Sequence, residues 1–229
     1  MLVSIYSLAV GLSGIGLLVY ELLAGTQQLD LRPILLFAFL SLLVQRSSFH
    51  FGTQIVHSLA GVIDVAAVLA LGPVSGALVA AASGLAYLVL DALNRRRLTQ
   101  GDLLELPVFD GGLKALLALG SGSLFQALAG PLPLAPEGLQ AASDLDSQVV
   151  LGVTAICLFW FAGDHLAWGV RDYLAVFADR ESNRRECAAY LVWLGGYRQA
   201  VVVILFRYQV NQFIHFGSQI GCAFVDWVT

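Results

Sequence analysis

Long apolar stretches separated by short polar loops run through most of the chain. Continuous apolar runs predict helices at about 2–23, 33–45, 55–71, 74–93, 106–128, 148–170 and 188–206. The runs are continuous rather than alternating, which argues against a membrane β-barrel. A helix needs about 20 mainly apolar residues to cross roughly 30 Å of hydrocarbon. The pattern therefore predicts an all-α, polytopic transmembrane bundle of about seven helices, within a range of six to eight.

Breaks in the apolar pattern set the expected domain organisation. Gly72-Pro73 ends one run, because proline does not continue a helix comfortably, and the stretch GPLPLAPEG forms a loop between two others. We expect one bundle over residues 1–206. The tail at 207–229 is more polar, and we interpret it as a partner-binding end or a partial eighth helix.

Composition supports a membrane protein and excludes several other classes. The chain is 58% hydrophobic and 12% charged, with a mean hydropathy of +0.79, whereas soluble domains carry about 25% charged residues. No basic face with interleaved aromatic residues suggests nucleic-acid binding. Cys157, Cys187 and Cys222 lack metal-ligand spacing. With no catalytic set either, we expect a non-enzymatic protein without a metal or a cofactor.

Basic residues predict the orientation in the bilayer. The three loops that alternating crossings place on one side contain Arg46, Arg95, Arg96, Arg97, Arg171, Arg180, Arg184 and Arg185. The opposite loops contain only Arg32 with certainty. Because cytoplasmic loops carry the excess of Lys and Arg, we expect the amino terminus to be cytoplasmic in a bacterial inner membrane.

One helix edge is free of large side chains. Gly72, Gly76, Ala80 and Gly84 recur at every fourth position. Helices in lipid associate by close van der Waals contact, which small residues permit. We expect this edge to pack against another helix, with the floor of a ligand cavity as the alternative.

Charged residues within the apolar helices are the candidate site. Asp64 lies in the middle of the run at 55–71, where it must face other helices, carry a proton or line water. Asp110 and Lys114 are four residues apart and share one helix face. Each feature has two interpretations, a structural polar contact or contact with a ligand.

Histidines give weaker signals. His50 and His57 would lie about 10 Å apart along one helix, which is too far for one metal ion. Asp164 and His165 are adjacent and do not share a helix face, so we do not expect them to form a facing pair. The predicted orientation places them near the cytoplasmic interface, together with Trp160 and Trp168.

Two stretches carry a family resemblance. LALGPVSGALVAAASGLAYLVLD, a basic loop and LPVFDGGLKALLALGSG together resemble the multi-pass amino-terminal membrane region of bacterial HD-GYP and GGDEF signalling proteins, over roughly residues 30–206. Those regions have a Phe-Asn-like pair where this chain has Phe109 and Asp110. No HD or GGDEF motif occurs in the sequence, so the resemblance implies a sensory or scaffold membrane module.

Three functions fit these observations. The first is a sensory module that passes a signal to a protein partner through the basic segment 171–187 or the tail. The second is a substrate-binding membrane subunit of a small-molecule transporter, with Asp64, Asp110 and Lys114 lining its cavity. The third is an accessory subunit of a larger membrane complex.

Overall fold

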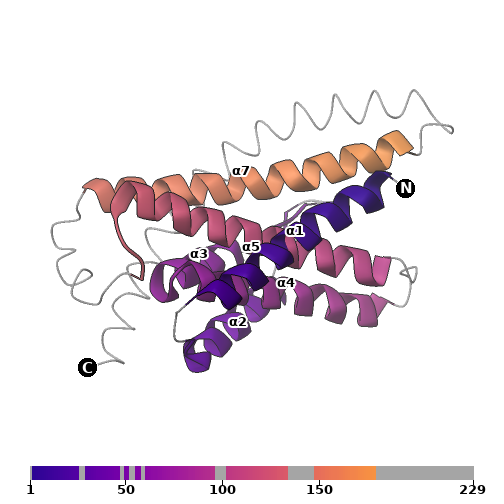
Figure 1. Ribbon diagram of the computed structural model, residues 1–229. Coiled ribbons are helices and arrows are strands. Elements are labelled where there is room, and N and C mark those ends of the chain that lie inside the picture. Colours follow the sequence, from indigo (N-terminus) through magenta and orange to yellow (C-terminus); the bar gives the residue numbers. More distant parts are fainter. Residues whose placement is uncertain are drawn as a thin grey trace. The chain divides into compact units, whose positions relative to one another are not determined.

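The computed structural model describes residues 2–25, 29–46, 49–51, 55–57, 60–95, 102–133 and 147–178. This part contains the helices α1 (Leu2–Ala24), α2 (Leu31–Arg46), α3 (Ala60–Leu71), α4 (Pro73–Arg95), α5 (Asp102–Ala129) and α7 (Ser147–Ala178), and the strands β1 (Phe49–Phe51) and β2 (Ile55–His57) (Figure 1). The chain divides into two compact units, Met1–Arg171 and Asp172–Thr229. All contacts described below lie within the first unit.

The all-α prediction is confirmed for the described residues, which form six helices and one short hairpin. Three segments, Leu2–Ala24, Glu105–Ala129 and Ser147–Ala175, are long and apolar enough to cross a membrane. The predicted helix at 188–206 and the tail at 207–229 lie outside the described residues.

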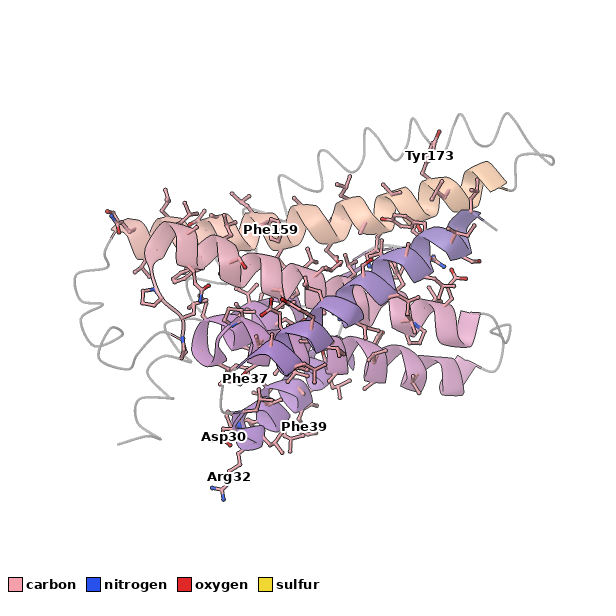
Figure 2. The ribbon with its side chains drawn as sticks, viewed as in Figure 1. Asp30, Arg32, Phe37, Phe39, Phe159 and Tyr173 are labelled. Carbon is pink, nitrogen blue, oxygen red and sulfur yellow. The ribbon has the colours of Figure 1, made fainter. Side chains whose placement is uncertain are left out.

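Local capping explains where α2 begins. Asp30 precedes α2, and its Oδ1 accepts a hydrogen bond of 3.0 Å from the Arg32 backbone N–H. This is the role of an N-cap residue, which satisfies an amide that has no partner inside the helix. The cap adds two residues to the predicted start of α2, and Figure 2 shows Asp30 and Arg32 at this end of the helix.

Gly72 joins α3 to α4 in a single residue. Its φ of +88° is one that residues with a side chain rarely adopt. Its N–H donates to the Val68 carbonyl at 3.0 Å, and its own carbonyl accepts from the Gly76 N–H at 2.9 Å. Pro73 is the first residue of α4, where its missing N–H costs nothing. The predicted break therefore forms a tight helical hairpin.

The start of the third predicted helix was wrong. Residues Ile55–His57 form β2, which pairs antiparallel with β1 so that Phe49 lies opposite His57 and His50 opposite Val56. The helix begins only at Ala60, and Asp64, its fifth residue of twelve, still lies near its middle. His50 and His57 are thus on paired strands, and the spacing estimate for a continuous helix does not apply to them.

Glycines lie at the contacts of helix α5 with α1, α4 and α7. A Cβ at Gly14 of α1 would overlap the Gly112 backbone, and one at Gly84 of α4 would lie 3.4 Å from the Gly111 Cα. A Cβ at Gly120 would lie 2.9 Å from the Phe159 ring of α7. Half of the span Glu105–Ala129 is buried within the protein.

These contacts also give the helix directions. Gly11 contacts Val108 and Gly14 contacts Gly112, so α1 runs parallel to α5. By contrast α4 and α7 run antiparallel to α5. Their contact pairs are Gly84 with Gly111, Pro73 with Gly122, Gly152 with Phe125, and Gly163 with Leu117.

The remaining helices continue the alternation. Ile34 clusters with Ala67 and Val79, and further along α2 Ser41 contacts Asp64 and Ser83. From the first set of contacts to the second, the residue numbers increase along α2 and α4 and decrease along α3. Helix α2 is therefore parallel to α4 and antiparallel to α3. Successive described helices α1, α2, α3, α4, α5 and α7 point alternately in opposite directions.

Large apolar side chains cover the outside of several helices. Those of α1 include Leu2, Ile5, Leu8, Leu12, Leu17, Val19, Tyr20 and Leu23. Phe39 of α2 is 59% exposed and Phe159 of α7 is 41% exposed, and Figure 2 shows both side chains. Apolar surface on this scale marks an interaction site with a membrane or a protein.

Candidate functional site

A polar network lies inside the bundle between α2, α3 and α4. The Ser41 hydroxyl donates to Asp64 Oδ1 at 2.8 Å and lies 3.2 Å from the Ser83 hydroxyl. Gln45 Nε2 lies 3.4 Å from Ser83 Oγ and 3.5 Å from Ser41 Oγ. Ser83 in turn donates to the Ala80 carbonyl at 3.0 Å. Four side chains from three helices therefore meet at one buried point.

Two oxygen atoms of this network lack partners. Asp64 is 0% exposed and Gln45 is 3% exposed. Among the described residues, Asp64 Oδ2 and Gln45 Oε1 have no hydrogen-bond partner. Burying a polar group without a partner typically costs about 1–3 kcal/mol. Both atoms are acceptors, so a hydrogen-bond donor or a cation would satisfy them.

Asp110 and Lys114 form the predicted pair on α5. Lys114 Nζ lies 3.2 Å from Asp110 Oδ2, and both side chains are largely buried. Gly84 lies directly against this pair, because a Cβ there would be 2.7 Å from Asp110 Oδ2 and 3.1 Å from Lys114 Cδ. The absence of a side chain at Gly84 therefore makes space for the ion pair between α4 and α5.

Asp164 of α7 joins the same group of charges. Lys114 interacts electrostatically with Asp110, Asp64 and Asp164. Asp164 also interacts with both other carboxylates. The interpretation of Asp164 as an interfacial residue stays a prediction, and the structure adds its electrostatic interaction with the charges of α5. The structure brings together the three predicted site residues Asp64, Asp110 and Lys114, and adds Asp164.

The small-residue edge of α4 meets more than one neighbour. Gly72 forms the hairpin turn, and a Cβ at Gly76 would lie 2.6 Å from the Val68 Cα of α3. Ala80 is fully buried, and Gly84 faces α5. Positions four apart in a helix drift by about 40° per step, because 3.6 residues make one turn. Over twelve residues the edge therefore passes from α3 to α5.

A second cluster joins the ends of α1, α5 and α7. Arg171 Nη2 lies 3.7 Å from Glu105 Oε1, and Arg171 Nε donates to the Ser7 hydroxyl at 3.3 Å. The guanidinium carbon lies 6.0 Å from the Phe109 ring centroid and 5.6 Å from that of Trp168. Trp168 therefore contacts protein side chains, and its position at the membrane interface stays a prediction.

Sequence reasoning missed Ser41, Gln45 and Ser83. Ser41 and Gln45 are four residues apart in an apolar helix, so they share one face in the same way as Asp110 and Lys114. That spacing was a usable signal for the pair. Ser83 adjoins Gly84 and gave no comparable signal, because a lone serine in a small-residue helix is common.

No protein-family model matches the chain, and no curated protein or solved structure matches it significantly. Function is therefore inferred from the arrangement of the side chains.

Proposed function

We propose that the chain is a non-enzymatic, polytopic module of a bacterial inner membrane. In this proposal it binds a ligand among its helices and signals through the basic segment 171–187. The observation that carries the proposal is the buried group of Asp64, Asp110, Lys114 and Asp164, which connects α3 and α5 to α7. A charged residue inside a membrane bundle is costly and is commonly retained for function.

The alternating helix directions support the orientation. The Tyr6 hydroxyl donates to the Ala167 carbonyl at 3.1 Å, and Arg171 contacts Ser7 and Glu105. The start of α1, the start of α5 and the end of α7 therefore share one side of the first unit. The ends of α2 and α4, with Arg46 and Arg95, point to that same side. The concentration of arginines there favours the cytoplasm.

The length of α7, rather than the depth of the charges, favours sensing over the transport alternative. Asp110 and Lys114 follow Glu105 by five and nine residues, or about 8 and 14 Å along the helix. Lys114 therefore lies near the middle of a hydrocarbon layer roughly 30 Å thick, where transporters also bind their substrates. Helix α7 has 32 residues, more than the roughly 20 that a span needs, so it continues beyond the hydrocarbon.

Trypsin cleavage of the full chain in lipid nanodiscs tests the proposal. The rate of cleavage after Arg180, Arg184 and Arg185 is the readout, and the rate of cleavage after Arg95 is the internal reference. We expect Asp64→Asn and Asp164→Asn to change the readout rate about fivefold or more, since coupling free energies are typically 1–3 kcal/mol. The rate at Arg95 should stay constant.

The matched control is Ser123→Ala. This variant removes an exposed hydroxyl that bonds only to the Leu119 carbonyl of its own helix. A readout rate that is the same in the wild type, the control and both cluster variants would contradict a signalling role.

A further inference from the structure

The donors of the polar network, including the Gln45 amide that is directed at Ser41 and Ser83, leave some of its acceptors without a partner. The Ser41 hydroxyl already donates its hydrogen bond to Asp64 Oδ1, and the Ser83 hydroxyl donates to the Ala80 carbonyl. Asp64 Oδ2 and Gln45 Oε1 therefore stand unpaired among the described residues, on side chains that converge on Ser41. A positively charged or donating group would satisfy both atoms.

The charged side chains near the network include more carboxylates than cationic groups. Three carboxylates, those of Asp64, Asp110 and Asp164, interact with the single ammonium group of Lys114. The Lys114 ammonium already forms an ion pair with Asp110, with 3.2 Å between Nζ and Oδ2. Charges removed from water need compensation by partners close at hand. The group as a whole is therefore short of positive charge when its carboxylates are ionised.

We propose that this network is a binding site for a sodium-sized monovalent cation, held by Asp64 Oδ2 and Gln45 Oε1 with the hydroxyl oxygens of Ser41 and Ser83. The assignment rests on the proposed ligand-binding module and names the class of its ligand. Carboxylate, amide and hydroxyl oxygens are the donors that hard cations prefer.

The enclosure of the site sets the size and charge of the ligand. Ser41, Asp64 and Ser83 are each 0% exposed, so the site admits an ion rather than an organic molecule unless the helices separate. One carboxylate and three neutral oxygens supply a single negative charge, which balances a monovalent ion. Among the described residues, no group of three or more His, Cys, Asp or Glu side chains is placed to hold a metal ion, so neutral oxygens would have to supply most of the ligands.

Thermal unfolding of the full chain in nanodiscs at pH 8 tests the assignment. The probes are sodium chloride, potassium chloride and choline chloride at constant ionic strength. A ligand that binds only the folded state raises Tm as its concentration rises above Kd. We expect Tm to rise with sodium, more weakly with potassium, and not with choline.

Three variants make the test specific to the site. Asp64→Asn keeps the shape of the side chain and removes its charge, and Gln45→Met removes the amide oxygen; each should weaken the apparent sodium affinity at least tenfold. Ser123→Ala should respond to sodium as the wild type does. A melting profile at pH 6 and pH 8 without sodium separates binding of the cation from binding of a proton.

The proposal is overturned if sodium and choline give the same Tm in the wild type, or if Asp64→Asn keeps the full sodium response. It is equally overturned if a fall in pH alone raises Tm and sodium adds nothing, since a proton would then occupy Asp64. Altered cleavage at Arg180, Arg184 and Arg185 in the same variants would leave the signalling module standing in each of these cases.

Discussion

Gly14 of α1 and Gly112 of α5 lie with their backbones in direct contact, so that a Cβ on either residue would overlap the backbone of the opposite helix. Close backbone approach maximises van der Waals contact, which is the main source of helix association in lipid. This crossing holds α1 in place beside α5, next to the charged pair.

Gly14→Ala should separate these two helices. The added methyl group meets backbone, which cannot rotate away as a side chain can, so we expect a loss of about 1–3 kcal/mol of stability. Gly16→Ala is the matched control, because nothing lies within 4 Å of a Cβ there. That variant should be neutral or slightly stabilised. Thermal unfolding in detergent compares the two, and equal Tm values would contradict the crossing.

Lys114→Met should destabilise the bundle more than Asp110→Asn. Loss of the lysine leaves three carboxylates without their shared ammonium, and breaking a buried ion pair costs about 3–5 kcal/mol. Loss of the Asp110 charge instead reduces the excess of negative charge. Denaturation of both single variants and the double variant forms a thermodynamic cycle. A larger loss for Asp110→Asn than for Lys114→Met would show that the charges are not arranged as described.

Arg171→Lys should cost more than Glu105→Gln. The lysine keeps the charge but loses the planar group that lies over Phe109 and Trp168. We expect a loss of about 0.5–2 kcal/mol from these cation–π contacts. The ion pair to Glu105 is also largely buried but longer, with 3.7 Å between Arg171 Nη2 and Glu105 Oε1, so we expect its loss to cost about 1 kcal/mol. Urea denaturation of both variants in detergent is the measurement, and the reverse order would assign the stabilisation to the ion pair.

The sequence predicted helices better than it predicted their partners. Apolar runs located α1 and α4 to within two residues at each end, because helix length follows directly from the length of the apolar run. The predicted start of α3 was wrong because Ile55 and Val56 are β-branched apolar residues that suit a strand as well as a helix. A short apolar run of this kind does not distinguish a strand from a helix.

The candidate site was predicted in part. Asp64, Asp110 and Lys114 were identified because a charge within an apolar run is conspicuous. Their proximity to one another was not predictable, since it depends on which faces of α3 and α5 meet α4. The electrostatic interaction of Asp164 with these charges was not predictable for the same reason, because sequence spacing gives a position along α7 and not the neighbouring charges.

Accessibility of single cysteines to a membrane-impermeant maleimide tests the alternating topology most directly. In a chain with Cys157, Cys187 and Cys222 replaced by serine, cysteines are placed singly at Gly25, Pro131, Arg95 and Asp172. The account predicts that intact cells label positions 25 and 131, and that inverted membrane vesicles label positions 95 and 172. Labelling of position 25 together with position 95 from the same side would contradict the arrangement of helices on which the proposed site depends.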